Sequence, residues 1–354
     1  MKAFFASEQL LHQPLQFMRA GRICAPTDVP ARATTLNEAL AAKGISSQVP
    51  PDYALNLPAV HSLPYLTFLK DGFQRWQALA QTGLQPGPEI LPNMAPYYNG
   101  RTDLDQRAEC PSPSIIAQAS WYLGDLACPV GPHTWTAALR SAHSAIAAAE
   151  SVCASGGMAY ALCRPSGHHA HRDRASGFCY LNNSAMAAQR LRDTYASVLL
   201  LDVDAHHGDG SQNIFYHRAD VMTVSLHADP ASYFPFYTGY PHEHGHGSGH
   251  GYNLNLPLPH GAGNDVFLDA LDKALMSIRD FRPQALVLAL GFDGYKDDPI
   301  SVLRLELDVY RQLGERIGAL GLPTVIVQEG GYMLDSIGQA LDFFLQGVQH
   351  TSSE

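Results

Sequence analysis

The residues of this 354-residue chain with the clearest chemical potential follow an apolar run in the segment LLLDVDAHHGDG, residues 199–210. An extended chain places residues i and i+2 on one face, about 7 Å apart, so Asp204 and His206 can approach one cation. A carboxylate oxygen with an imidazole nitrogen suits zinc or a similar divalent ion. A polar strand end with a helix cap at Asp209 is the alternative for a lone Asp-x-His pair. Three carboxylates and two histidines after one buried run favour the metal site.

A second histidine pair lies in RPSGHHAH, residues 164–171, again after an apolar run. Packing seldom needs adjacent imidazoles, whereas His168 and His169 with different carboxylate partners can supply a general base and an acid or electrostatic partner. Two loop histidines satisfied by hydrogen bonds are the structural alternative. We expect His171, the last residue of the segment, at the surface.

Two further segments place polar residues after apolar runs. In LALGFDGYKDDP, Asp293 can join Asp204 and His206 as a third protein ligand, which leaves one coordination position open, as in catalytic zinc sites. In VQEGGY, two glycines permit a tight turn that aims the Tyr332 phenol at a developing oxyanion.

Many of the 17 histidines lie between positions 168 and 260, and several alternate with glycine in PHEHGHGSGHGY, residues 241–252. This composition suggests metal binding. A metal site needs rigidly held ligands, however, and the segment offers no rigid element. We therefore predict a structural glycine-rich loop here.

The apolar patterns predict how these segments are positioned. Buried strands are expected at 158–163, 197–203, 221–226, 252–256, 285–290 and 324–328. Helices are expected at 31–43, 65–82, 138–150, 182–195, 265–279, 305–320 and 337–348. Strands buried on both faces and joined by helices imply an α/β fold, with a parallel sheet covered by helices on both faces. Ligands of such sheets bind at the carboxyl ends of strands, where the chemical residues fall.

We expect one domain over residues 1–354, although the length alone also permits two. Residues 85–114 are rich in Pro, Gly, Asn and Tyr and predict a long loop. Loops of that length in a compact domain are usually functional or interfacial.

The composition excludes several classes of protein. The chain is 46% hydrophobic and 16% charged, which argues against disorder and coiled coil. Its formal charge of −10 disfavours a nucleic-acid partner. No apolar run reaches the roughly 18 to 20 residues of a membrane span, so no membrane partner is expected. The amino terminus is too polar for a secretory signal, and the six cysteines show no C-x-x-C spacing. We expect a cytoplasmic protein with reduced cysteines.

Six ordered motifs point to a family: RPSGHHA, GFCYLNN, LDVDAHHGDG, VSLH, LGFD and EGGY. Together they cover roughly residues 134–348 and resemble the arginase/deacetylase superfamily, specifically its histone-deacetylase-like zinc amidohydrolases. HADPASYFPFYTGY and DDPISVLRL are similar to the bacterial acetylpolyamine amidohydrolases. The resemblance implies a single arginase/deacetylase-type domain with a central parallel sheet of about eight strands.

The resemblance also assigns roles. It implies zinc, with Fe²⁺ or Co²⁺ as alternatives, on Asp204, His206 and Asp293. The implied catalytic residues are the tandem histidines His168 and His169, their carboxylate partners Asp202 and Asp209, and the carbonyl-polarising phenol of Tyr332. The implied substrate tunnel is formed by Gly177, Phe178 and Phe234. A structural K⁺ is implied at Asp202, Asp204, His206, Ser225 and Leu226.

The implied reaction is hydrolysis of a short acyl group from a primary amine, most simply acetylputrescine, acetylcadaverine or acetylspermidine. A protein acetyl-lysine deacetylase and a non-catalytic ligand-binding relative are the alternatives. An arginase-like hydrolase would need a second metal site, which the order Asp-Val-Asp-Ala-His does not match. Acidic residues that read a distal ammonium in this family align with Ile116 and Ala127. Asp103, Asp105 and Glu109 are the expected substitutes, in a loop that relatives use to form homodimers and narrow the tunnel mouth.

Overall fold

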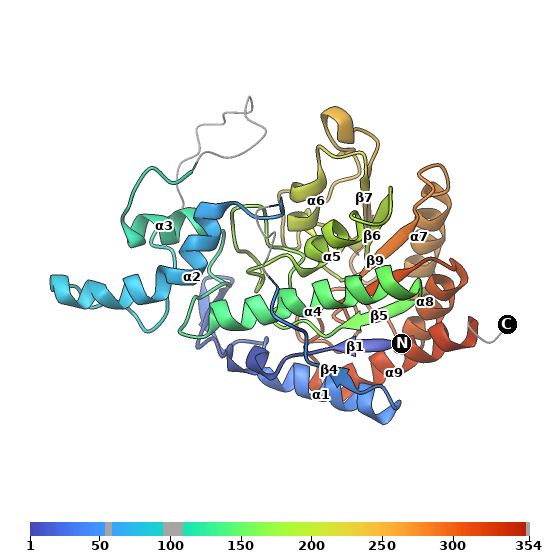
Figure 1. Cartoon of the computed structure of the whole chain (residues 1–354), viewed down its shortest axis with the longest axis horizontal. Coiled ribbons are helices and arrows are strands. Elements are labelled where there is room, and N and C mark those ends of the chain that lie inside the picture. Colours follow the sequence, from blue (N-terminus) through green and yellow to red (C-terminus); the bar gives the residue numbers. More distant parts are fainter. Residues whose placement is uncertain (54–58, 95–108, 352–354) are drawn as a thin grey trace.

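The computed structural model describes residues 1–53, 59–94 and 109–351 (Figure 1). Its centre is an eight-stranded sheet in the order β4-β1-β5-β10-β9-β6-β7-β8, and every neighbouring pair is parallel. The strands are β1 (Lys2–Phe4), β4 (Ser47–Gln48), β5 (Met158–Ala161), β6 (Val198–Asp202), β7 (Val221–Ala228), β8 (Asn253–Leu258), β9 (Ala285–Leu290) and β10 (Thr324–Gln328). The predicted parallel α/β architecture is confirmed.

Helices cover both faces of this sheet. They are α1 (Pro30–Ala42), α2 (Leu63–Ala78), α3 (Ile115–Tyr122), α4 (Thr134–Ser155), α5 (Asn183–Leu191), α6 (Asp209–Phe215), α7 (Asn264–Ser277), α8 (Asp308–Ala319) and α9 (Leu334–Thr351). Residues of α2 to α6 contribute to one buried apolar cluster, and residues of α1, α7, α8 and α9 contribute to the other. Figure 1 shows α2 and α3 on the side of the molecule away from α7 and α8.

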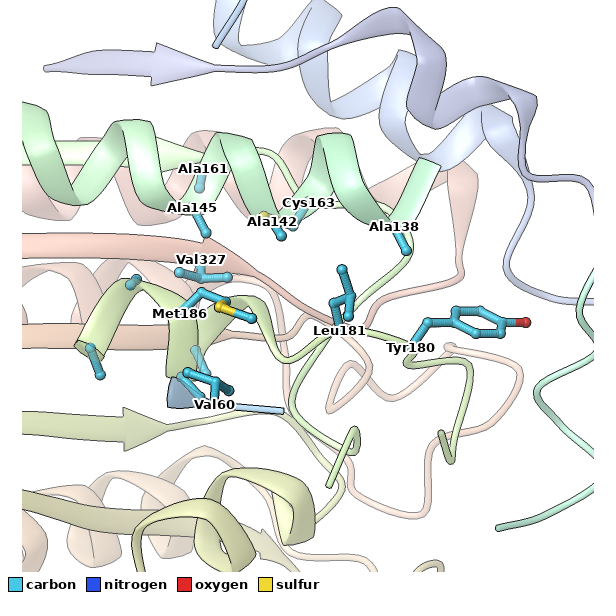
Figure 2. Close-up of a cluster of buried hydrophobic side chains, with 14 of the residues drawn as sticks. Val60, Ala138, Ala142, Ala145, Ala161, Cys163, Tyr180, Leu181, Met186 and Val327 are labelled. Carbon is cyan, nitrogen blue, oxygen red and sulfur yellow. The ribbon is translucent and has the colours of Figure 1, made fainter. Parts of the chain in front are cut away.

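Strand β9 shows why the sheet strands are apolar almost throughout. Ala285, Val287 and Ala289 pack into the cluster under α4 and α5, whereas the alternating leucines pack into the opposite cluster. On this face, α4 presents alanines with helical spacing, at 138, 142 and 145: Ala145 lies toward Val327 and Ala138 toward Leu181 (Figure 2). Small side chains on α4 allow the helix to lie close to the strands.

The structure adds elements that the sequence patterns did not predict. Strands β1 and β4 are three and two residues long, too short to show alternation. The helices α3 and α6 were also missed. A small antiparallel hairpin is formed by β2 (Phe17–Arg19) and β3 (Arg22–Cys24). The described parts of the 85–114 segment contain no helix and only an isolated bridge from Ile90 to Val130.

No helix within the described ranges is long and apolar enough to cross a membrane.

Candidate active site

The site lies at the carboxyl ends of five adjacent strands, β5, β10, β9, β6 and β7. Parallel neighbours end at the same edge of a sheet, so segments far apart in the chain meet there. These segments contain all the residues to which a catalytic or metal-binding role was assigned from the sequence.

Asp204, His206 and Asp293 come together as the sequence predicted. Each offers a ligand atom, and these atoms lie within 4.8 Å of one another. His206 Nδ1 lies 2.8 Å from Asp293 Oδ2 and 3.2 Å from Asp204 Oδ1. The loop after β10 lies directly against them. A Cβ on Gly330 would lie 2.5 Å from Asp204 Oδ2 and 2.6 Å from Asp293 Oδ2. The close approach explains the glycine.

The electrostatics of this trio fit a bound cation. Burial raises the pKa of Asp293, and the neighbouring Asp204 carboxylate raises it further. Burial opposes protonation of His206, but its hydrogen bonds with Asp204 and Asp293 outweigh burial and raise its pKa to about 9. Two buried carboxylates therefore require a positive partner. Two oxygens and one imidazole nitrogen are a donor set that suits zinc or a similar divalent ion.

The tandem histidines have separate carboxylate partners. His168 Nδ1 lies 2.9 Å from Asp202 Oδ2, and His169 Nδ1 lies 2.7 Å from Asp209 Oδ1. Burial favours neutral His168, but Asp202 and Asp204 outweigh it and raise the pKa of His168 well above its ordinary value. Burial, and then the neighbouring His168, lower the pKa of His169 to about 4. The two rings are thus biased toward opposite protonation states.

The expectation that His171 lies at the surface was wrong. Its side chain is only 13% exposed, and Nε2 lies 2.7 Å from Asp209 Oδ2. The two oxygens of Asp209 therefore serve two imidazoles, those of His169 and His171. Burial raises the pKa of Asp209, but the histidines outweigh it and hold the pKa well below its ordinary value.

Tyr332 lies in the cavity wall on a firmly held loop. Burial raises the pKa of its phenol well above the ordinary value, despite the opposing charge of Arg32, so the hydroxyl is a proton donor. The Arg32 guanidinium lies over the Tyr332 ring, 4.4 Å from its centroid. Arg32 also donates to the carbonyls of Gly331 (2.5 Å) and Glu329 (2.7 Å). On the other side, Asp298 Oδ2 accepts the Tyr332 backbone N–H at 2.6 Å.

Three residues that support the site, Arg32, Asp298 and Glu329, were not assigned a role from the sequence. Arg32 lies on α1, almost 300 residues from the loop it holds, so no local pattern identifies it. Asp298 lies in the DDPISVLRL segment, but only its family resemblance was noted. Glu329 lies in EGGY, and its buried carboxylate accepts the N–H of Gly167 at 2.7 Å and of His168 at 3.1 Å. Burial raises its pKa to about 7.

A cavity of about 460 Å³ leads from the surface to His169, His206 and Tyr332. Phe178 and Phe234 lie in its wall, as expected for the tunnel. The Phe234 ring meets the His169 ring edge-on at 4.9 Å. Gly177 has a φ of +55°, and a Cβ there would collide with the His169 ring. Only glycine permits this approach.

The residues assigned to K⁺ lie on β6, the segment after it and β7. Asp202 pairs with Ser225 in the sheet register, and Leu226 is the next residue of β7. The Asp202 carboxylate contacts the His168 ring and the backbone N–H of Asp204, and Ser225 Oγ lies 2.8 Å from His227 Nδ1.

The His/Gly segment contributes no metal-binding group within the described part of the chain. Among the described residues, two sets of three side chains are close enough to share an ion, Asp204–His206–Asp293 and His168–Cys179–Glu329, and neither includes a residue of the His/Gly segment. Glu243 instead ties the segment down, since it accepts from Gln212 Nε2 at 2.8 Å and from the Gly239 N–H at 2.9 Å.

The entrance of the cavity differs from the expectation. Ala127 lines it, but Ile116 is partly buried against the apolar core instead. Asp103 and Asp105 lie outside the described residues, and Glu109 is exposed. Phe17, Met18, Arg19 and Ala20 of the β2–β3 hairpin line the wall. The two strands are joined by the turn Ala20–Gly21, in which both residues have positive φ values, and the glycine of this turn is the one feature of the hairpin that could be noticed in the sequence.

Comparison with known proteins agrees with this geometry. A model of the histone deacetylase domain matches residues 26–348. An acetylpolyamine amidohydrolase of Burkholderia pseudomallei is 46% identical, over 97% of this chain and 98% of that protein. Acetylpolyamine amidohydrolase 1 of Pseudomonas aeruginosa is 38% identical, over 99% of each chain. A crystal structure of the Burkholderia pseudomallei acetylpolyamine aminohydrolase covers 99% of both chains with a TM-score of 0.92 and 45% identity. The match across the catalytic segments implies a metal cofactor, and the chain belongs to the histone deacetylase family of hydrolytic enzymes.

Proposed function

We propose that the protein is a metal-dependent deacylase that hydrolyses acetylated polyamines. The observation that carries the proposal is the convergence of His169, His206 and Tyr332 at the inner end of one cavity. The names of relatives matched over nearly their full length support the substrate class. A non-catalytic relative would not need an acid, a base and a cation site together.

The proposed metal ligands are Asp204, His206 and Asp293, and zinc suits their donor set, with Fe²⁺ or Co²⁺ as alternatives. A bound divalent ion would supply a Lewis acid that polarises the acyl oxygen and lowers the pKa of water.

The side chains provide the proton transfers. Amide hydrolysis joins the water oxygen to the acyl carbon, breaks the C–N bond and delivers a proton to the departing nitrogen. His169 is the proposed base, since its pKa is lowered to about 4 and its Nδ1 is engaged by Asp209, which leaves Nε2 to accept the proton. His168, biased toward the protonated form, is the proposed electrostatic or acid partner. Asp202 and Asp209 fix the orientation of the two rings.

Tyr332 is the proposed donor to the oxyanion. Its phenol stays protonated, and its loop is held from both sides by Arg32 and Asp298. A donor fixed before the reaction begins stabilises developing charge without reorganisation. Phe178 and Phe234, together with Gly177, which lies against the His169 ring, suit an unbranched methylene chain better than a branched one.

Several finer features are proposed on the family resemblance. K⁺ is assigned to Asp202, Asp204, His206, Ser225 and Leu226. A homodimer, a cytoplasmic location and the absence of nucleic-acid and membrane partners complete the proposal. A dimer contact through residues 85–114 would narrow the cavity mouth and favour a free polyamine over a peptide.

Metal analysis with a substrate panel tests the function. We expect a divalent ion in about one equivalent per chain, and kcat/KM at least tenfold higher for acetylputrescine, acetylcadaverine or acetylspermidine than for an acetyl-lysine peptide. A tenfold preference for the peptide would overturn the substrate class. Loss of turnover in the metal-free protein, restored by zinc, would support the metal assignment.

A further inference from the structure

The entrance of the cavity carries a cation that acetylated polyamines do not need. Arg19 is an exposed residue at the end of β2 and lines the cavity. The hairpin is fixed in place by a hydrogen bond from the Met18 N–H to the Leu126 carbonyl at 3.0 Å. Phe17 packs edge-on against Phe178 at 5.4 Å, so the hairpin and the tunnel wall form one surface.

The guanidinium of Arg19 is available for a ligand. Its Nη1 donates to the Pro299 carbonyl at 3.3 Å, which orients the group beside the cavity residue Ile300. Arginine has five N–H donors, and among the described residues the Pro299 carbonyl is the one hydrogen-bond acceptor of the Arg19 side chain. Within the described ranges, no carboxylate forms an ion pair with Arg19.

Among the described residues, the cavity wall contains no carboxylate that would oppose the charge of Arg19. Its described lining consists of apolar and aromatic side chains together with Ser232, two histidines and Arg19, and it contains no carboxylate. The acidic residues of the metal trio lie beneath the inner end, where a bound divalent ion would offset their charge. The described wall is therefore positive at its outer end.

A second arginine strengthens this charge. Arg22 pairs with Arg19 across the hairpin, so both side chains project from the same face. Like charges directly opposite each other destabilise a strand pair. A hairpin whose two strands have three residues each has little packing to offset that cost, which suggests that the charge has a use.

We propose that Arg19 binds a carboxylate at the far end of the substrate, so that the enzyme also hydrolyses N-acetylated ω-amino acids with unbranched chains. Such a molecule presents the same methylene-linked acetamide to the inner end as an acetylated diamine. A carboxylate accepts two parallel N–H bonds from a guanidinium, whereas a distal ammonium is repelled by it. The products are acetate and the free ω-amino acid. The inference rests on the proposed deacylase function and extends its substrate class.

The test compares two substrates with five methylenes each, 6-acetamidohexanoate and N-acetylcadaverine, which differ only at the far end. We expect the wild-type enzyme to hydrolyse both. Arg19→Gln should lower the ratio of kcat/KM for the anionic substrate to that for the cationic one by about tenfold, mainly through KM. Arg19→Glu should lower it further. Higher ionic strength should weaken the preference of the wild-type protein.

Arg22→Gln is the matched control, since it removes the same charge from the same hairpin at a residue that does not line the cavity. We expect its ratio to change less than threefold. The inference is overturned if N-acetylcadaverine is hydrolysed and 6-acetamidohexanoate is not, or if Arg19→Gln and Arg22→Gln change the ratio equally. If neither substrate is hydrolysed by the zinc-loaded protein, the proposed function fails and the inference fails with it.

Discussion

The inner end and the entrance of the cavity are held in different ways. The inner end rests on five adjacent strand ends, and its aspartates and tandem histidines are almost fully buried. The entrance is built from a short hairpin and from loops, in which the cavity residue Phe236 is 47% exposed and the following Tyr237 is 92% exposed.

The rigid inner end and the exposed entrance suit two different tasks, bond breaking and substrate choice. Bond breaking requires groups fixed within tenths of an ångström, which buried hydrogen bonds on rigid strands provide. Substrate choice requires surfaces that can change without disturbing those groups, and loops tolerate such change. Substitutions at the inner end should therefore affect metal content and kcat, and substitutions at the entrance should affect KM.

The largest effect is expected at the metal trio. Asp204→Asn keeps the size of the side chain but removes a charge, so metal retention should be lost and turnover should fall by roughly 10³-fold or more. Metal analysis and steady-state kinetics measure both. Asp269→Asn removes a charge from an exposed position on α7 and should change neither. Stoichiometric metal with normal activity in Asp204→Asn would remove the assigned site.

The next effect separates chemistry from metal binding. Tyr332→Phe removes only a hydroxyl, so we expect the metal content to persist while kcat falls by roughly 10²-fold, the usual scale for one oxyanion donor. Tyr237→Phe, at a largely exposed tyrosine, is the control. An unchanged kcat in Tyr332→Phe would make that tyrosine a packing residue.

The inner end was largely predictable from the sequence, because each of its residues follows a legible strand. The bounds of β9 and β10 match the predicted 285–290 and 324–328 to the residue. β9 is a continuous apolar run that ends at a glycine, and β10 has an apolar centre between Thr324 and Gln328. Both strands are buried along their whole length, as expected for strands covered on both faces of a sheet.

What the sequence could not reveal depends on contacts between distant segments. Asp28 pairs with both Arg32 and Arg164, and the latter is 136 residues away. His171 was misplaced because no local pattern shows that the two oxygens of Asp209, 38 residues further along the chain, contact both His169 and His171. The entrance hairpin has strands of three residues, too short for a period to be visible.

The third prediction concerns stability. His61 supports the tandem-histidine loop, since Nδ1 donates to the His171 carbonyl and Nε2 accepts the Asn182 N–H, both at 2.9 Å. Burial lowers its pKa from 6.5 to about 4. Between these values the unfolded state binds the extra proton, so His61 contributes fully above pH 6.5 and loses about 3 kcal/mol of its contribution as pH falls to about 4.

Denaturant unfolding between pH 7 and pH 4 measures this contribution. The free energy of unfolding should fall less steeply with acidification in His61→Gln than in wild type, although the variant is less stable at pH 7. His242→Gln, at an exposed histidine of the His/Gly segment, should retain the wild-type slope. Equal slopes in all three proteins would contradict the assignment of a neutral buried His61.

A smaller effect is expected from His171. In His171→Gln, Asp209 loses its second imidazole and its charge acts more fully on His169, so the pKa of His169 should rise. If neutral His169 is the base, the acid limb of the kcat/KM profile should move to higher pH, while the plateau changes only a few-fold. His244→Gln, at an exposed histidine, is the control. If the plateau value of kcat/KM falls but the pKa of the acid limb does not change, His171 has a purely structural role.

The smallest effect is expected at the entrance, where Met18 lines the cavity and is 40% exposed. Met18→Ala removes apolar contact area for the methylene chain of the substrate, while the backbone bond from Met18 to Leu126 persists. We expect KM for N-acetylcadaverine to rise two- to threefold, which is roughly 0.5 kcal/mol of binding energy, with kcat and metal content unchanged. The same substitution should matter less for N-methylacetamide, whose chain is too short to reach the hairpin. A fall in kcat would show that the hairpin also positions the reacting groups, and the separation between the entrance and the inner end would then fail.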